Sequence, residues 1–368
     1  MGARLRSMTS PELTSTPPQL DRAGVLALGA ENPHWFTSSS QRLSCEVALS
    51  CEKLGRGESF TAWLLRAADG PGGLDGAEVV VRVPRRPVAE LSQAMDTEFA
   101  ALARAPQGLT AQPVDMHSPT PHDPRAYRVT TRVPGVVRAT EDWRSADFGR
   151  LAEQLARLHV HAAGESGIHA VAYTPVADAE AAYDWWCSHE PEAAATISPL
   201  MPGLVRHQQE AAALSPQAER CFIHGDVSLS NVLLDSSGCP RLVDWEWSGQ
   251  GDPAKDLAYS GGPVYLEPFY APMSQTQIRA QAQAYARERQ TLGVPVDLEE
   301  LLARRCGYLM HEVLFTSAHF WRVAQAGGEE AELYARRSEL MRHRVSEHLS
   351  GGSNLHRAEP SRDSPITP

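Results

Sequence analysis

The stretch "CFIHGDVSLSNVLLDSSGCPRLVDWEW", residues 221–247, places acidic and amide side chains between short apolar runs. The runs "NVLLD" and "PRLVDW" flank the turn sequence Asp-Ser-Ser-Gly, which predicts a hairpin of two short strands. Because the two arms of a hairpin pair, Asn231 and Asp244 should come together near its open end. Asp226 lies five residues before Asn231. The stretch therefore predicts three oxygen-bearing side chains held close to one another by a hairpin.

These three side chains have the chemistry that phosphoryl transfer from a nucleotide requires. Carboxylate and amide oxygens are hard ligands that suit Mg²⁺, which indicates Asn231 and Asp244 as metal ligands. Asp226 is placed to accept a proton from an attacking hydroxyl group. A metal that neutralises phosphate charge and a base that orients the nucleophile are the main parts of such a reaction.

The constellation resembles the aminoglycoside phosphotransferase and choline kinase family, whose members are small-molecule relatives of protein kinases. The resemblance rests on "HGDVSLSN" at 224–231, "VDWEW" at 243–247 and "GDPAKDLA" at 251–258, and it extends over about residues 50–325. It implies an α+β, two-lobed protein-kinase-like fold, with a small β-rich N-lobe and a larger helical C-lobe. It also implies that Asp226 is the catalytic base, and that Asn231 and Asp244 hold Mg²⁺.

The pattern along the chain divides it into four parts. Residues 1–40 predict a flexible N-terminal segment with a short helix near "DRAGVLALGA", residues 41–132 a nucleotide-binding N-lobe, residues 133–350 a helical C-lobe with the catalytic loop and the acceptor site, and residues 351–368 a disordered tail. Within the N-lobe the expected order is strand, strand, strand, helix, strand. In the C-lobe, helical periodicity predicts long amphipathic helices from about residues 147, 276 and 296.

The segment "LGRGESF", residues 54–60, falls between the first two expected strands. Its residues Gly55, Gly57 and Ser59 are predicted to bind the phosphates of ATP or GTP. Glycines at such a turn let backbone N–H groups approach a phosphate closely. The segment "VTTRVPGV", which follows later, resembles the hinge between the lobes. Its main-chain groups around Thr131 and Val133 are expected to meet the base of the nucleotide.

The third strand of the family carries a basic residue that grips the phosphates and pairs with a glutamate on the next helix. In this chain that position is Arg82 rather than a lysine, and Glu98 is the expected partner. Arginine keeps the positive charge but presents a planar fork with different geometry. The alternative is that Arg82 forms a surface ion pair with another acid.

Several residues near these motifs have structural interpretations. The sequence "DFG" at Asp147–Gly149 precedes the catalytic loop and opens an amphipathic helix, so it predicts a helix start and not the metal site. His224 is expected to brace the catalytic loop through hydrogen bonds. Asp252 and Asp256 are expected to fix that loop and the start of the following helix.

The acceptor site is predicted in residues 165–215, where the family inserts acceptor-binding helices. This stretch contains seven acidic residues and one arginine, and its candidate contacts are Asp184, Trp185, Trp186, Glu190 and Glu192. Acidic and aromatic groups fit a cationic acceptor, while the alternative is a solvated helical face. The favoured acceptor is an aminoglycoside-like antibiotic; an amino alcohol, a sugar, or a serine or threonine of a modified peptide are alternatives. A non-catalytic, nucleotide-binding pseudokinase is the rival from another class.

The charge and composition of the chain also limit the classes of partner and the cellular location that are expected. The chain has 368 residues and a formal net charge of −11, which argues against nucleic acid and anionic membranes as partners. No apolar run approaches the length of about 20 residues that a spanning helix needs, and the first residues lack the apolar core of a signal peptide. No pair among the six cysteines has zinc-ligand spacing, so reduced thiols in the cytoplasm are expected. The oligomeric state stays open.

Overall fold

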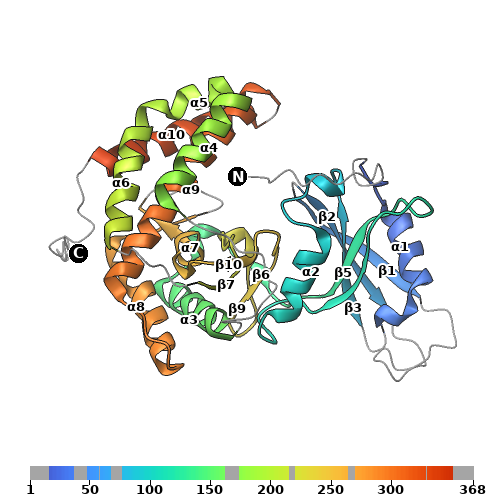
Figure 1. Cartoon of the computed structure of the whole chain (residues 1–368). Helices are drawn as coiled ribbons and strands as arrows, with labels where there is room; N and C mark the ends of the chain where they lie inside the picture. Colours follow the sequence, from blue (N-terminus) through green and yellow to red (C-terminus); the bar gives the residue numbers. More distant parts are fainter. Residues whose placement is uncertain are drawn as a thin grey trace, which may run out of the picture.

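The computed structural model describes residues 16–36, 48–57, 59–67, 77–161, 174–214, 220–263, 270–328 and 330–350. These residues form a smaller lobe built on a sheet and a larger lobe built mainly of helices (Figure 1). Among the described helices, none is long and apolar enough to cross a membrane.

The sheet of the smaller lobe is antiparallel and has the strand order β1-β2-β3-β5-β4. Its strands are β1 (Leu49–Arg56), β2 (Phe60–Ala67), β3 (Glu78–Pro84), β4 (Pro113–His117) and β5 (Tyr127–Thr131). Strand β3 alternates, with Val79, Val81 and Val83 buried in the core of this lobe. Because successive side chains of a strand point to opposite faces, Arg82 projects from the other face.

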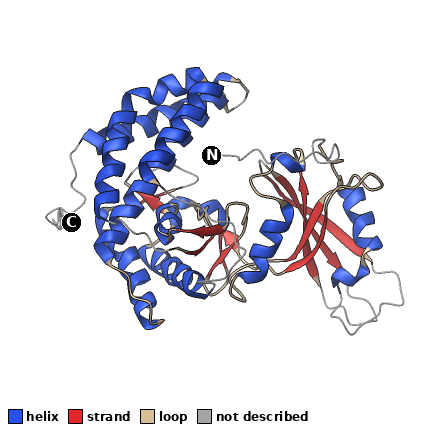
Figure 2. Cartoon of the chain, in the orientation of Figure 1, coloured by secondary structure: helices blue, strands red, loops and turns tan. Residues whose placement is uncertain are grey.

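The two helices of the smaller lobe lie on opposite faces of this sheet (Figure 2). Helix α2 (Met95–Arg104) lies on the side of the larger lobe, and its residues Ala101 and Leu102 join the core of that lobe. Arg82 therefore faces the helix that carries Glu98. Strand β4 was not predicted from the sequence and lies between α2 and β5 along the chain.

Helix α1 (Arg22–Glu31) and the 3₁₀ helix η2 (Pro33–Phe36) cover the outer face of the sheet. Val25, Leu28 and Trp35 are buried in the same core as strand β3. This part of the chain therefore belongs to the smaller lobe, which differs from the predicted flexible segment at 1–40. Residues 1–15 and the predicted tail at 351–368 lie outside the described residues.

The larger lobe contains the long helices that the periodicity predicted. Its helices are α3 (Ser145–His161), α4 (Pro175–His189), α5 (Pro191–Ile197), α6 (Met201–Leu214), α7 (Pro253–Ala258), α8 (Gln275–Thr291), α9 (Leu298–Gln325) and α10 (Ala331–Ser350). The three predicted amphipathic helices correspond to α3, α8 and α9. Figure 1 shows α6, α9 and α10 running together on the side of this lobe that lies away from the sheet.

Short strands occupy the part of the larger lobe that faces the smaller one (Figure 1). Strands β6 (Val136–Val137), β8 (Val232–Leu234) and β9 (Pro240–Leu242) form one sheet, and β7 (Cys221–Ile223) pairs with β10 (Gly249–Gly251). A further pair consists of β11 (Gly261–Gly262) and β12 (Ala271–Pro272). Strands β8 and β9 are the predicted hairpin, and they set the positions of the residues at its open end.

Candidate active site

The open end of the β8–β9 hairpin brings Asn231 next to the segment that carries Asp244. Val232 pairs with Leu242, and the backbone N–H of Val243 donates to the carbonyl oxygen of Asn231 at 3.0 Å. Asp244 alone among the described non-glycine residues has a positive φ, of 67°. Such a left-handed conformation costs about 1–3 kcal/mol and is concentrated at functional sites. The carboxylate that this strained residue carries contacts Arg82 of the smaller lobe.

Asp226 and Asn231 contact each other directly. Nδ2 of Asn231 donates to Oδ2 of Asp226 at 2.8 Å and to its backbone carbonyl at 3.0 Å. A carboxylate accepts hydrogen bonds only, so the amide nitrogen of Asn231 must be the atom that faces it. The amide oxygen of Asn231 is therefore the atom left to bind a metal.

The surroundings of Asp226 raise the pKa of its carboxyl group to about 7. Burial is the largest cause, followed by the negative charges of Glu312 and Asp244, while Lys255 acts in the opposite direction. A base whose pKa lies close to neutral pH combines a useful ionised fraction with the ability to hold a proton. This raised pKa is consistent with the predicted role of Asp226 as the base, which stays a prediction.

Asp256 holds the backbone of the loop that leads to Asp226. Its buried carboxylate accepts from the N–H groups of His224 and Gly225 at 2.8 and 2.7 Å. It also lies 3.0 Å from Nε2 of His159, whose Nδ1 is 2.8 Å from the hydroxyl of Tyr285. The loop is thus tied through Asp256 to helices α3 and α8.

His224 braces the same loop from inside, in agreement with its predicted structural part. Its Nε2 lies 3.0 Å from the carbonyl oxygen of Val243, and its Nδ1 accepts from the N–H of Asp226 at 3.3 Å. Burial lowers the pKa of His224, which is consistent with a neutral imidazole in these two bonds. The ring therefore connects the base loop to the segment before Asp244.

Gly225 has a conformation and a contact that exclude a side chain. Its φ is 86°, and a Cβ atom there would lie 2.1 Å from the backbone oxygen of Trp247. Gly225→Ala is expected to lower the free energy of unfolding by about 2 kcal/mol or more and to reduce phosphotransfer sharply, because the loop would have to move. Thermal unfolding and turnover would measure both effects.

Gly149→Ala is the matched control for that substitution. Gly149 lies within α3, and its nearest neighbour would be the side chain of Ala284, at 4.0 Å. An alanine there should leave the stability equal or slightly higher, because glycine is unfavourable inside a helix. Equal unfolding temperatures and turnover for Gly225→Ala and the wild type would contradict the tight packing of the loop.

Arg82 connects the smaller lobe to the hairpin residue. Its guanidinium donates to Oε1 of Glu98 at 2.8 Å and to Oδ1 of Asp244 at 2.6 Å, and it lies over the ring of Phe60. Glu98 also pairs with the buried Arg128, which the sequence did not indicate. Burial alone would raise the pKa of Asp244, but the charge and hydrogen bond of Arg82 outweigh it and hold the pKa low. The predicted partners Arg82 and Glu98 therefore meet in the structure.

Glu246 is a further carboxyl group of this cluster that the sequence reasoning did not select. Burial, followed by the charge of Asp244, raises the pKa of Glu246 to about 7. The side chain of Ser59 hydrogen-bonds to Glu246 and acts in the opposite direction. The signal was present in the sequence, since Glu246 stands two positions after Asp244 in "DWEW".

The predicted phosphate-binding glycines lie at the turn between β1 and β2. Gly55 lies at the end of β1, next to an irregularity in the strand pairing, and the N–H of Gly57 donates to the carbonyl of Phe60 at 2.9 Å. A Cβ atom at Gly55 would meet nothing within 4 Å, and one at Gly57 would meet only that carbonyl, at 3.7 Å. The fold itself therefore does not require glycine here, so a ligand that approaches the backbone would explain it better.

The predicted hinge begins within strand β5, whose last residue is Thr131. The N–H of Thr131 donates to the carbonyl of Gln112 at 2.9 Å, and the Thr131 hydroxyl accepts from the N–H of Gln112 at 2.8 Å. The backbone N–H of Thr131 is therefore already hydrogen-bonded within the smaller lobe. The predicted contact with the base of a nucleotide then depends on the main chain around Val133. The contact of this segment with a base stays a prediction.

The predicted acceptor residues lie on α4 and at the start of α5. Trp186 is buried in the core of the larger lobe, so its expected role as a contact for the acceptor is a misassignment: its ring serves packing. Asp184 lines a hollow of about 580 Å³ between α4 and α6 whose lining does not include Asp226. Trp185 stacks on His189, with ring centroids 4.6 Å apart. The acids Glu190 and Glu192 also stay untested predictions.

Glu312 on α9 is an acidic residue whose charge acts on Asp226. Its charge is the strongest of the charges acting on Asp226. Its carboxylate accepts from the hydroxyls of Tyr259 and Tyr270 at 2.8 and 3.2 Å. No local pattern indicated this residue, because the long helix that carries it begins more than fifty residues after the hairpin.

Asp147 of the "DFG" sequence occupies the first turn of α3, as predicted. Its carboxylate accepts from the N–H of Arg144 at 2.9 Å and from the side chains of Arg138 and Arg150, each at 2.7 Å. These three hydrogen bonds engage both carboxylate oxygens of Asp147 without a metal. Asp252 similarly caps α7 by accepting from the N–H of Ala254 at 2.9 Å.

The smaller lobe brings the Arg82–Glu98 pair to Asp244, beside the pair of Asp226 and Asn231. This arrangement is that of a kinase-like phosphotransferase. Residues 50–294, more than half of the chain, match the model of the phosphotransferase enzyme family. The chain belongs to this family.

Comparison with known proteins supports the same class. A viomycin phosphotransferase from Streptomyces vinaceus is 32% identical over 163 residues, which are 41% of this chain and 55% of that protein. The match therefore spans little more than half the length of that relative.

Solved structures confirm the α+β, two-lobed kinase-like fold. Choline kinase from Cryptosporidium parvum Iowa II has a TM-score of 0.61 at 11% identity, over 90% of this chain and 97% of that chain. The GDP complex of wild-type aminoglycoside 2'-phosphotransferase-IIIa has a TM-score of 0.58 at 14% identity, over 89% of this chain and 100% of that chain. At these identities the likeness concerns the fold.

Proposed function

We propose that this protein transfers the γ-phosphoryl group of ATP or GTP to a hydroxyl group of a small, amine-bearing molecule. The observation that carries the proposal is the contact between Asp226 and Asn231 beside the Arg82–Asp244 pair. In this proposal Asp226 accepts the proton of the acceptor hydroxyl, while Asn231 and Asp244 hold the metal. Mg²⁺ would neutralise the charge that develops on the phosphates.

The donor set fits Mg²⁺ because it combines a carboxylate with an amide oxygen. The carboxylate of Asp244 has the low pKa of an ionised ligand, and the amide oxygen of Asn231 is not the atom that faces Asp226. Arg82 lies 2.6 Å from Asp244 and is held by Glu98, so its positive charge is available to phosphates near the metal. Gly55, Gly57 and the loop around them would cover the nucleotide.

The acceptor class follows from the charge around Asp226. Glu312 brings a carboxylate into the surroundings of the base, together with the aromatic residues Tyr259 and Tyr270 that bond to it. A carboxylate flanked by aromatic rings is suited to a protonated amine. The viomycin phosphotransferase and the aminoglycoside 2'-phosphotransferase support an antibiotic as the favoured acceptor. An amino alcohol, as in choline kinase, is the alternative that the same charge permits.

A screen of acceptors tests this proposal. The purified protein would be incubated with Mg²⁺ and ATP or GTP against aminoglycosides, viomycin, amino alcohols, sugars and hydroxyl-containing peptides, with mass detection of a phosphorylated product. We expect products from amine-bearing alcohols and none from neutral sugars of similar size. Products from neutral sugars alone would contradict the amine-bearing class, while products from none of these acceptors would favour the pseudokinase.

Glu312→Gln is expected to weaken the binding of a cationic acceptor but not the binding of the nucleotide. The substitution removes the charge but keeps the size of the side chain, so the KM for the acceptor should rise by about 10-fold or more, since a charged hydrogen bond is worth about 1.5–3 kcal/mol. The KM for the nucleotide should stay unchanged. Glu332→Gln, at a fully solvated position of α10, is the control. Equal acceptor KM values for Glu312→Gln and the wild type would remove Glu312 from acceptor binding.

A further inference from the structure

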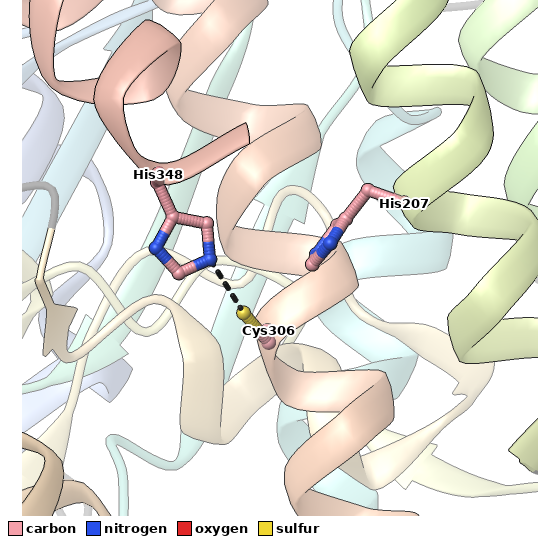
Figure 3. Close-up of side chains that lie close together, drawn as sticks. All are labelled: His207, Cys306 and His348. Atoms are coloured by element: carbon pink, nitrogen blue, oxygen red, sulfur yellow. Dashed lines mark hydrogen bonds between the residues drawn. The ribbon is translucent and has the colours of Figure 1, made fainter. Parts of the chain in front are cut away.

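Three side chains with metal-ligand chemistry converge in the larger lobe, away from the catalytic loop. They are His207 on α6, Cys306 on α9 and His348 on α10 (Figure 3). One donor atom from each lies within 4.8 Å of the other two. Figure 3 shows the two imidazole rings on either side of the Cys306 sulfur. The three helices are far apart in the sequence, so the cluster exists only in the folded chain.

The distances approach those of a tetrahedral zinc site. Zinc bonds of about 2.0–2.1 Å to nitrogen and 2.3 Å to sulfur place donor atoms roughly 3.3–3.6 Å apart in a tetrahedron. Nε2 of His348 lies 3.5 Å from Sγ of Cys306, which matches that spacing. The rings of His207 and His348 are nearly perpendicular, with centroids 5.7 Å apart. The widest pair of donor atoms is at most 4.8 Å apart, so metal binding would require these side chains to approach by up to about 1 Å.

The helices that carry these ligands are fixed to one another beside the cluster. Gln208, next to His207, donates from its side-chain nitrogen to the carbonyl of Gly307, next to Cys306, at 2.7 Å. A Cβ atom at Gly307 would lie 2.9 Å from the side-chain oxygen of Gln208, so a larger residue there would displace that amide. The frame that holds two of the ligands is therefore already set.

Helix α10 is seated on α6 at the same level. A Cβ atom at Gly203, one turn before His207, would meet the side chain of Leu349 at 3.4 Å. Leu349 directly follows His348 along the chain. The contact places the end of α10 where His348 reaches Cys306.

One nitrogen of the cluster is buried without a hydrogen-bond partner in the described part of the chain. His207 is only 7% exposed, and its Nε2 has no hydrogen-bond partner among the described residues. Buried polar atoms are nearly always paired, so an unpaired nitrogen in this cluster calls for an explanation. A metal bound between the two would supply the missing partner.

The charges around the cluster suit a divalent cation. Burial lowers the pKa of His207 to about 4, while the charge of Glu210, one turn further along α6, acts in the opposite direction. Burial raises the pKa of the Cys306 thiol to about 11, so the metal would displace a proton: the S–H bond breaks, the S–Zn bond forms and one H⁺ is released. One thiolate and the nearby Glu210 carboxylate would offset the two positive charges of the metal, beside the charge of Arg305, which lowers the pKa of the same thiol.

We propose that His207, Cys306 and His348 form a zinc site that ties the end of α10 to α6 and α9. Two imidazoles and one thiolate are ligands typical of Zn²⁺, with water completing the tetrahedron. The site is structural, since it fastens the helix that carries Glu312 to its two neighbours and lies apart from Asp226.

The test uses the full chain, without an affinity tag, stripped of metal by a chelator. Zn²⁺ is added back and its content measured by elemental analysis, and Co²⁺ is added in parallel because a cysteine ligand gives a sulfur-to-cobalt charge-transfer absorption. We expect one equivalent of Zn²⁺, that absorption, and an unfolding midpoint raised by roughly a few degrees. All three readouts are independent of phosphotransfer.

Cys306→Ser and His348→Gln should each lose the cobalt absorption and the zinc-dependent rise in the midpoint. His343→Gln, at an exposed position of α10, and Cys187→Ser, at an exposed position of α4, are the matched controls and should keep both. Circular dichroism without metal verifies that each variant is folded. No bound zinc in the wild type, or equal binding in the Cys306→Ser and His348→Gln variants, would overturn the proposal and leave a thiol–imidazole hydrogen bond only.

Discussion

Asp226→Asn is expected to lower the turnover of phosphotransfer by about 10²–10⁴-fold while nucleotide binding survives. The asparagine keeps the shape of the side chain, and its oxygen still accepts the hydrogen bond from Nδ2 of Asn231. The loop geometry that Asp256 and His224 maintain should therefore be unchanged. What is lost is the ability to take the proton of the acceptor hydroxyl.

The measurement compares turnover with nucleotide affinity in the same preparations. Single-turnover kinetics with an accepted substrate gives the first, and calorimetric titration with the Mg²⁺–nucleotide complex gives the second. Ser230→Ala, at an exposed position of the same loop, is the control and should change neither substantially. If Asp226→Asn turned over as fast as the wild type, Asp226 would have no part in proton transfer.

Asp244→Asn is expected to weaken Mg²⁺-dependent nucleotide binding by about 10²-fold or more, because a charged metal ligand is lost. Asparagine is chosen because it tolerates the positive φ of this position better than alanine does. The change therefore reports on the charge and not on the strained backbone. Calorimetric titration of the nucleotide with and without Mg²⁺ measures it.

Asp147→Ala tests whether the aspartate of "DFG", which is predicted to start a helix, has any part in metal binding. It removes the acceptor for Arg138, Arg144 and Arg150, so the unfolding midpoint should fall. Its Mg²⁺-dependent nucleotide affinity, measured well below that midpoint, should equal that of the wild type. The opposite pattern, with affinity lost in Asp147→Ala and kept in Asp244→Asn, would mean that the metal site is misassigned.

The hairpin residues were predictable from the sequence because their juxtaposition is local. Asn231 and Asp244 are brought together by one turn and one strand register, and Asp226 precedes Asn231 by five residues. The pair of Arg82 and Glu98 came from the family resemblance, and the two residues are separated by a single connection. Periodicity likewise predicted α3 and other long helices, since it identifies which face of an element is apolar.

The remaining features depend on how distant elements pack, which periodicity does not specify. Glu312 reaches the surroundings of Asp226 because α9 crosses the larger lobe, and the cluster of His207, Cys306 and His348 needs three helices to meet. Trp186 was assigned to the acceptor from local composition, yet it points into the core. A tryptophan next to acidic residues has the same local sequence whether its side chain is exposed to solvent or packed in the core.

The measurement that tests the central claim most directly is the stoichiometry of the reaction, monitored by phosphorus NMR. The protein would be mixed with ATP or GTP, Mg²⁺ and an acceptor from the screen. We predict one phosphate monoester of the acceptor for each nucleoside diphosphate formed, and no ester when a chelator removes Mg²⁺. Nucleoside diphosphate formed with inorganic phosphate alone, or nucleotide that binds but is never consumed with any acceptor, would contradict a phosphotransferase built on Asp226, Asn231 and Asp244.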